Sequence, residues 1–130
     1  MCGIAGARND WLIEQGFDPV VAIAKATAEL GWRGPDSQAT EHASDWWLGC
    51  ARLAISGPNA RQPVVRRGGR FVGVMNGAIT NARELWPMFS KRAGTRPAPP
   101  NDAWLPLLAV ANNRTNTLAR LRGHHAYAVI

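Results

Sequence analysis

The sequence predicts an α+β fold, and three observations support this prediction. Residues 46–55 are typical of a strand, in which every second side chain lies on the same face. Two apolar runs, residues 63–65 and 71–75, flank a Gly-Gly turn and predict a β-hairpin. Residues 19–30 carry apolar side chains at helical spacing. Strands that form a hairpin, together with amphipathic helices, indicate a mixed α+β protein.

Length and composition indicate one ordinary globular domain over residues 1–130. No apolar run approaches the roughly 20 residues of a membrane span, and no signal peptide is recognisable, so we expect a cytoplasmic protein without a membrane partner. Two cysteines, Cys2 and Cys50, cannot make a disulfide framework, and no Cys or His cluster has metal-ligand spacing. We therefore expect neither a metal nor a cofactor.

The net charge of +6 comes from thirteen Arg and two Lys against nine acidic residues. The arginines are scattered, apart from the group at residues 66–70, and aromatic side chains do not interleave with them. A solvated hairpin tip explains that group better than a nucleic-acid site. We expect no nucleic-acid partner.

Cys2 is the candidate nucleophile. Removal of Met1, which a small second residue permits, would leave Cys2 with a free α-amine beside its thiol. A thiol attacks as the thiolate, and a neutral amine can accept its proton. Met-Cys is also an ordinary start for a strand over residues 2–8. The small residues from Gly3 to Gly6 favour the functional interpretation, because they let substrate approach closely.

The next elements are a helix, a loop and a strand. Asp18 is expected to cap a helix that begins at Pro19 and ends before Gly31, with an apolar stripe along it. The stripe consists of Val20, Val21, Ile23, Ala24 and Leu30. Residues 32–37 are turn-rich and predict a loop. In the strand at 46–55, Arg52 lies either at a solvent-facing edge or in a pocket where its guanidinium binds a carboxylate.

The second strand of the hairpin runs into Asn76-Gly77. This pair ordinarily marks a turn. Alternatively, the Asn76 amide and the Gly77 N–H both donate hydrogen bonds to one developing oxyanion, where a single donor contributes roughly 3 kcal/mol.

The remaining chain predicts short elements. Asn101 or Asp102 is expected to cap an apolar helix. The other expected elements are a helix over 81–91 kinked at Pro87, an extended loop over 92–100, a helical turn over 117–122 and a strand over 124–130. His124 and His125 are adjacent, so a strand points them to opposite faces, which argues against a joint metal site.

Five ordered segments together resemble the class II, N-terminal-nucleophile glutamine amidotransferase domain, as in asparagine synthetase and amidophosphoribosyltransferase. The segments are Met1-Cys2-Gly3-Ile4-Ala5-Gly6, Arg33-Gly34-Pro35-Asp36-Ser37, Leu48-Gly49-Cys50-Ala51-Arg52-Leu53-Ala54-Ile55, Asn76-Gly77-Ala78-Ile79-Thr80-Asn81-Ala82-Arg83-Glu84-Leu85 and Leu121-Arg122-Gly123. The resemblance implies a four-layer αββα N-terminal-nucleophile sandwich, here shortened at its C-terminal end.

The resemblance also assigns roles. Cys2 would attack the side-chain amide of glutamine and form a thioester, while Asn76 and Gly77 stabilise the oxyanion. Arg52 would bind the substrate α-carboxylate and Asp102 its α-ammonium. The remaining substrate-binding positions are Ile55, Ser56 and Ala78.

Three positions depart from the family pattern. Ala78 replaces the Glu of asparagine synthetases, and Cys50 replaces a common His and puts a second thiol near the pocket. The segment around Asp102 keeps the Asp but lacks a following Glu. The family domain also continues through more strands, so we expect an exposed sheet edge that binds a second copy or a partner.

We therefore expect a standalone glutaminase that supplies ammonia to a separate synthetase or transferase, with activity that depends on Met1 removal and on the partner. Two alternatives stay open. One is a catalytically retired copy that serves as a binding or structural subunit, and the other is a hydrolase of a different amide. Arg52 and Asp102 argue against the last, because together they suit an amino acid.

Overall fold

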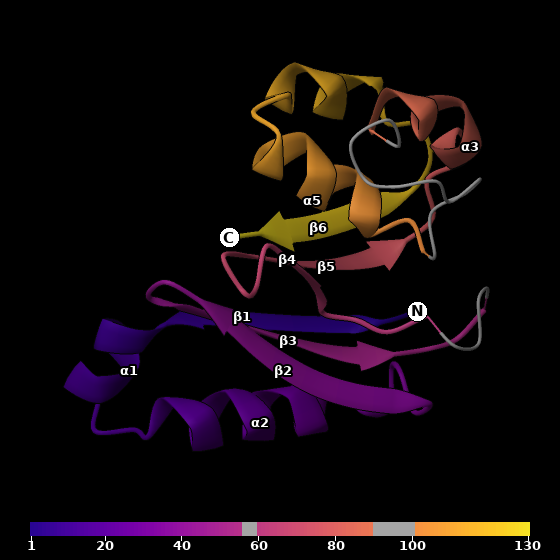
Figure 1. Ribbon diagram of the computed structural model, residues 1–130. Helices are drawn as coiled ribbons and strands as arrows, with labels where there is room; N and C mark the ends of the chain where they lie inside the picture. Colours follow the sequence, from indigo (N-terminus) through magenta and orange to yellow (C-terminus); the bar gives the residue numbers. More distant parts are fainter. Residues whose placement is uncertain (56–59, 90–100) are drawn as a thin grey trace.

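The computed structural model describes residues 1–55, 60–89 and 101–130, which form two antiparallel three-stranded sheets with helices outside them (Figure 1). The first sheet has the order β1-β3-β2, with β1 at Gly3–Arg8, β3 at Trp46–Arg52 and β2 at Ser37–Ala43. The second sheet has the order β4-β5-β6, with β4 at Val64–Arg66, β5 at Phe71–Gly77 and β6 at His125–Val129.

The helices are short and lie on the outer faces of the two sheets (Figure 1). They are α1 (Asn9–Glu14), α2 (Pro19–Glu29), α3 (Ala82–Leu85), α5 (Trp104–Ala111) and the 3-10 helix η1 (Thr115–Arg120). Figure 1 shows α1 and α2 beside the first sheet, and α3 and α5 beside the second, so the order through the molecule is helices, sheet, sheet, helices. In the described ranges no helix is long and apolar enough to cross a bilayer.

Successive residues of the central strand β3 face two different environments, α2 on one side and the second sheet on the other. Gly49 faces α2, where an added Cβ would lie 1.9 Å from Thr27 Oγ1, so only glycine permits this close packing. Cys50, on the other face, is fully buried in a cluster with Val72 and Val74 of β5. The second face of β3 therefore points to the space between the sheets.

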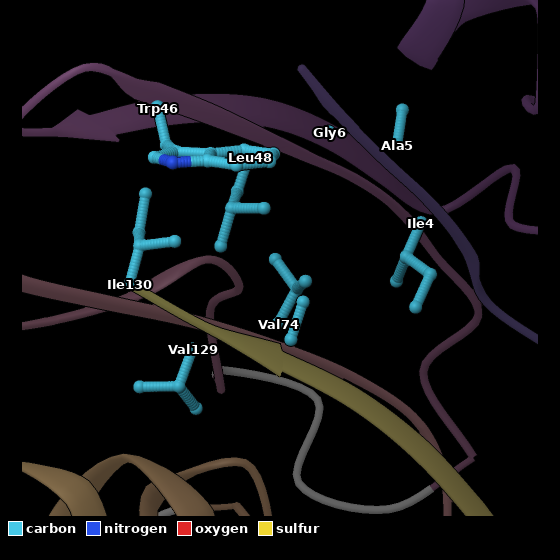
Figure 2. Close-up of a pocket in the computed structure, with 9 residues that line it drawn as sticks. Ile4, Ala5, Gly6, Trp46, Leu48, Val74, Val129 and Ile130 are labelled. Carbon is cyan, nitrogen blue, oxygen red and sulfur yellow. The ribbon is translucent and has the colours of Figure 1, made fainter. Parts of the chain in front are cut away.

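An apolar cavity of about 560 Å³ lies in that space. Figure 2 shows Trp46 and Leu48 of the first sheet pointing toward Val74 and Ile130 of the second. The side chains that line this cavity are apolar or small, and they include no acid or base. It offers space but no group for proton transfer or nucleophilic attack.

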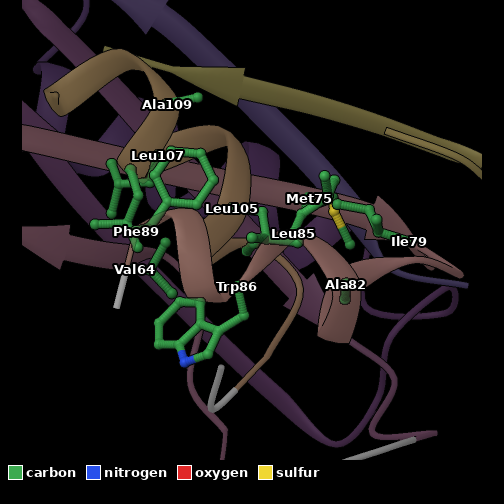
Figure 3. Packing of buried hydrophobic residues seen from close by; sticks show 12 residues of the cluster. Val64, Met75, Ile79, Ala82, Leu85, Trp86, Phe89, Leu105, Leu107 and Ala109 are labelled. Atoms are coloured by element: carbon green, nitrogen blue, oxygen red, sulfur yellow. The ribbon is translucent and has the colours of Figure 1, made fainter. Parts of the chain in front are cut away.

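The larger core lies between the second sheet and the helices that cover it (Figure 3). Leu105, Leu107 and Leu108 of α5 are fully buried there, together with Leu85 and Trp86. Burial of a leucine side chain contributes about 1.5–3 kcal/mol to folding. This core fixes β5, whose last residues enter the site described below.

The α+β prediction is confirmed, as are the strands, the hairpin and the capped helix. Asp18 Oδ1 accepts a hydrogen bond of 3.0 Å from the Val21 N–H at the start of α2. The predicted apolar stripe is partly wrong, because Val20 and Val21 are exposed and the helix buries Ile23 and Thr27.

Some boundaries also differ from the prediction. Strand β3 ends at Arg52, and the helical turn lies at Thr115–Arg120. The helix expected at 81–91 is interrupted next to Pro87 as predicted, because α3 covers Ala82–Leu85 and residues 87–89 are helical again after Trp86. Residues 90 and 91 lie outside the described residues. Elements α1 and β2 were not predicted. The loop expected over 92–100 lies outside the described residues, and the predicted pairing of a sheet edge with another chain stays a prediction.

Candidate active site

A cavity of about 370 Å³ opens where the ends of the two sheets meet. Its lining contains seven of the eight predicted site residues: Cys2, Arg52, Ile55, Asn76, Gly77, Ala78 and Asp102. The eighth, Ser56, lies outside the described residues. Side chains that are up to 100 positions apart in the sequence thus share one pocket, of the size that small-molecule sites have.

Cys2 lies directly before β1 and is half-buried at the cavity. Its thiol donates to the Leu53 carbonyl oxygen over 3.8 Å, and Arg33 Nε donates to the Cys2 carbonyl oxygen over 3.4 Å. The backbone of the candidate nucleophile is therefore held by the loop that follows α2.

The Cys2 thiol is acidified by its surroundings. A hydrogen bond from the Cys50 thiol is the main cause, and with the positive charges of the Met1 ammonium and Arg52 it opposes burial, so that the pKa of Cys2 is lowered to about 6. The same contact and burial raise the pKa of Cys50, which stays a protonated donor. Cys2 is thus the reactive thiol of the pair.

Arg52 stands at the end of β3, on the face that points between the sheets, and only 5% of it is exposed. The loop after α2 fixes this strand end. The Asp36 N–H donates to the Arg52 carbonyl oxygen over 3.0 Å, and Asp36 Oδ2 accepts a 2.6 Å hydrogen bond from the Ala54 N–H. Gly34 packs so closely that an added Cβ would lie 2.1 Å from the Ala51 carbonyl oxygen. This geometry supports the pocket interpretation of Arg52 over the solvent-edge interpretation.

Asn76 lies on the face of β5 that points to the first sheet. Val72 and Val74 occupy that face and pack against Cys50, and the two-residue period of a strand puts Asn76 next in the row. Asn76 Oδ1 is buried and has no hydrogen-bond partner among the described residues. A buried amide with an unused polar atom is suited to bind a ligand in the cavity.

The backbone N–H of Gly77 points away from β6. Val72 and Ile130 exchange two hydrogen bonds of 2.9 Å, and Ala78 donates to the His124 carbonyl oxygen over 3.0 Å. In an antiparallel pair every second residue is bonded in this way, so the N–H groups of Met75 and Gly77 point to the opposite side.

The hydrogen bond of Met75 supports that direction, because the Met75 N–H donates to Gln62 Oε1 over 2.6 Å and not to β6. Gly77 itself has φ +112°, and an added Cβ would lie 2.0 Å from the His124 carbonyl oxygen. Only glycine fits here.

Asp102 does not cap the following helix, as one interpretation of the sequence had it. Its Oδ2 accepts a 2.8 Å hydrogen bond from the Ile79 N–H, across the cavity-lining loop that follows β5. Asn101 makes the local turn instead, since its Oδ1 accepts from the Ala103 N–H over 2.9 Å. The carboxylate is therefore held at the pocket, and α5 begins at Trp104 without a side-chain cap.

Hydrogen bonds hold the segment after η1 against the loop that follows β5. Asn81 Nδ2 donates to the Arg120 carbonyl oxygen over 2.9 Å, and Asn81 Oδ1 accepts from the Arg122 N–H over 3.0 Å. Gly123, with φ +123°, passes so close to the Ala78 carbonyl oxygen that an added Cβ would lie 2.3 Å from it. Two separate sequence motifs thus form one structural unit around the end of β5.

Several lining residues were not predicted as part of the site. They are Met1, Leu53, Gln62, Met75, Thr80, Asn101 and His124. Gln62 is the most informative, because its buried side chain connects the chain before β4 to β5. A polar residue directly before Pro63, at the start of a predicted strand, was the only sequence signal for it.

The whole chain, residues 1–130, matches a known family, the glutamine amidotransferase domain. The chain is also 33% identical, over 148 aligned residues, to a putative asparagine synthetase [glutamine-hydrolyzing] of Mycobacterium bovis. Proteins of the same description from two strains of Mycobacterium tuberculosis match equally well. Each alignment covers 99% of this chain and 22% of the relative, so the chain spans about a fifth of the length of these relatives.

Proposed function

This chain belongs to the glutamine amidotransferase domain family, and from this membership we propose that it hydrolyses glutamine to glutamate and ammonia through a thioester on Cys2. One observation carries the proposal. A single cavity is lined by a thiol, a guanidinium, a carboxylate and an amide next to a directed backbone N–H. These are the groups needed to bind a free amino acid and to attack its side-chain amide.

Substrate binding is assigned to two charged residues. Arg52 offers a planar donor fork to the α-carboxylate, and Asp102 offers an acceptor to the α-ammonium. Ile55 and Ala78 line the pocket beside them, and Ser56 is expected to do so. The two charges define the amino-acid end of the substrate and leave its amide directed toward Cys2.

The chemical steps use Cys2 after removal of Met1. Its sulfur forms a bond to the amide carbon, and the α-amine accepts the thiol proton and passes it to the departing ammonia. The negative charge on the amide oxygen is stabilised by the Asn76 side-chain amide and the Gly77 N–H, two donors at the end of β5. Water then hydrolyses the thioester and releases glutamate.

We also infer that the helix, sheet, sheet, helix order over residues 1–130 is the N-terminal-nucleophile sandwich of one amidotransferase domain. The relatives named above are described as glutamine-hydrolysing asparagine synthetases, which supports transfer of the ammonia to a synthetase-type acceptor site. The gathering in one cavity of the polar site residues that the structure describes favours an enzyme over a retired binding subunit.

The test is glutamate release by purified protein whose N-terminal residue is checked by intact mass. We expect glutamate and ammonia in equal amounts from protein that begins at Cys2, and none from protein that retains Met1. Cys2→Ala should abolish release while the circular dichroism spectrum stays unchanged. Glutamate release at the wild-type rate by Cys2→Ala would remove Cys2 from its role, and asparagine as substrate serves as the specificity control.

A further inference from the structure

The chain has two cysteines, and the fold brings them together. Register pairs Gly3 with Ala51 and Ile4 with Cys50 in the first sheet. Directly opposite residues share a face and successive residues alternate, so Cys2 falls on the same face as Cys50, one diagonal step away. Both side chains pack in the cluster between the two sheets, and neither forms a disulfide in this structure.

The two thiols differ in access. Cys2 lines the cavity and is half-buried, whereas Cys50 is fully buried and does not line it. A small solute that enters the cavity therefore meets Cys2 first. A solute in the cavity does not reach Cys50. Cys50 can react with groups on the side chains that surround it, and Cys2 is one of these.

We propose that Cys50 is a resolving cysteine, which forms a reversible disulfide with Cys2 when hydrogen peroxide oxidises the nucleophile. The proposal rests on the proposed function only for its consequence, which is loss of glutaminase activity. The disulfide itself requires only the two thiols and their placement.

The first step occurs at Cys2. Its thiolate forms an S–O bond to one peroxide oxygen, the O–O bond breaks, and hydroxide leaves. In the second step Cys50 sulfur attacks the Cys2 sulfenic acid, the S–S bond forms, the S–O bond breaks, and the oxygen leaves as water with the Cys50 proton. The hydroxide of the first step takes up a proton from solvent, so two thiols and one peroxide give one disulfide and two waters.

The reactivity of the two sulfurs matches these roles. The pKa of Cys2 is lowered, mainly by the hydrogen bond from Cys50, so its thiolate is available to peroxide at neutral pH. The pKa of Cys50 is raised, so Cys50 is inert until a sulfenic acid forms beside it. The two side chains also lie on the same face of the sheet and pack in one cluster, so the sulfur atoms are near neighbours when the second step begins.

Backbone geometry limits the movement that is required. Diagonal neighbours in an antiparallel pair have Cα atoms about 7–8 Å apart, and a disulfide needs about 4.4–6.8 Å. Cys2 lies before the first paired residue, Gly3, so it can shift toward Cys50 without loss of a ladder hydrogen bond. The disulfide then protects the Cys2 sulfur from irreversible oxidation.

The experiment treats the full chain with hydrogen peroxide and maps its peptides without reduction. We expect a cross-linked peptide that contains Cys2 and Cys50, together with an intact mass lower by two hydrogens. Dithiothreitol should remove the cross-link. In Cys50→Ala and in Cys50→Ser, Cys2 should instead gain two or three oxygens, which dithiothreitol does not remove.

Activity gives a second readout. Wild-type glutamate release should fall at least about tenfold with peroxide and recover with dithiothreitol, whereas that of Cys50→Ala should not recover. A wild-type protein that gains oxygens on Cys2 without the cross-linked peptide would overturn the resolving role, even if the glutaminase is active. A cross-link in protein that begins at Cys2 and never releases glutamate would support the disulfide and refute the proposed function.

Discussion

The reactivity of the site depends on one sulfur atom and the atoms around it. Cys2 has a protonated thiol donor on one side and the buried Arg52 guanidinium nearby, and both favour its thiolate. The mechanism that we propose needs Cys2 to act as nucleophile and to carry its own base, so small changes at its neighbours should alter the rate.

The pH dependence of alkylation measures this effect. Because the pKa of Cys2 is lowered to about 6, the thiolate dominates above that pH, and iodoacetamide should modify Cys2 with a rate midpoint near pH 6. Cys50→Ala removes the main cause of the shift, so the midpoint should move to higher pH. In Cys2→Ala the buried Cys50 should stay unmodified across the range. A midpoint that is the same with and without Cys50 would contradict the assigned cause.

Arg52→Lys tests the carboxylate assignment. A lysine is a point charge and cannot reproduce a bidentate pair, and a charge-assisted hydrogen bond contributes about 1.5–3 kcal/mol, so KM for glutamine should rise roughly tenfold to a hundredfold. The change in kcat should be smaller, because the reacting amide is at the other end of the substrate.

Arg8→Lys is the matched control for that substitution. Arg8 is exposed at the far end of β1, where it pairs with Asp10, and its replacement should leave KM unchanged. An Arg52→Lys enzyme with wild-type KM would refute the role of Arg52, provided that its melting temperature shows an intact fold.

Secondary-structure elements position the site residues because two strands end, and one helix begins, at the cavity. Strand β3 delivers Arg52, β5 delivers Asn76 and Gly77, and the segment before α5 delivers Asp102. The loop after α2 was interpreted only as a connection, but its Asp36 binds backbone on both sides of Leu53 and so fixes the end of β3.

Gly77→Ala should damage both the fold and the site. The new Cβ would meet the His124 carbonyl oxygen, at a φ of +112° that side chains rarely adopt, so the free energy of unfolding should fall by about 3 kcal/mol or more and activity should be lost. Urea unfolding and glutamate release measure the two effects.

The matched control is Gly68→Ala at the hairpin tip. Gly68 has φ +63° but no atom within 4 Å of an added Cβ, so the cost should be only about 1 kcal/mol, with activity retained. Equal losses of stability in the two variants would show that the close approach of β5 to His124 is unimportant.

The molecule as a whole makes the site by placing two small sheets face to face. Neither sheet contains the site alone. Cys2 directly precedes the first strand of one sheet and Arg52 ends its central strand, whereas Asn76 and Gly77 belong to the other sheet. The packing between the sheets, through Cys50, Val72 and Val74, therefore brings the proposed nucleophile and the proposed oxyanion donors together.

Local patterns in the sequence predicted the elements with clear signals. Asp18-Pro19 marked the start of α2, and Gly68-Gly69 marked the hairpin, because capping and turn residues act over a few positions. Strand β2 was missed because six of its seven residues are not buried, so it shows no apolar period.

The site residues were predicted from ordered motifs, and the cavity contains those that the structure describes. The tertiary contacts around the site could not be predicted from the sequence. The role of Gln62 depends on contact with Met75, thirteen residues later in the chain. Cys2 and Cys50 lie close together because β1 pairs with β3, and no local pattern in the sequence specifies this pairing.

Direct capture of the intermediate provides the sharpest test of the mechanism. Protein that begins at Cys2 is mixed with glutamine, quenched in acid within the first turnover, and mapped by peptide mass. We predict a glutamyl group attached to the N-terminal peptide through Cys2, which disappears on treatment with hydroxylamine and is absent in Cys2→Ala. Glutamate release without any such adduct, or with an adduct on another residue, would contradict thioester catalysis by Cys2.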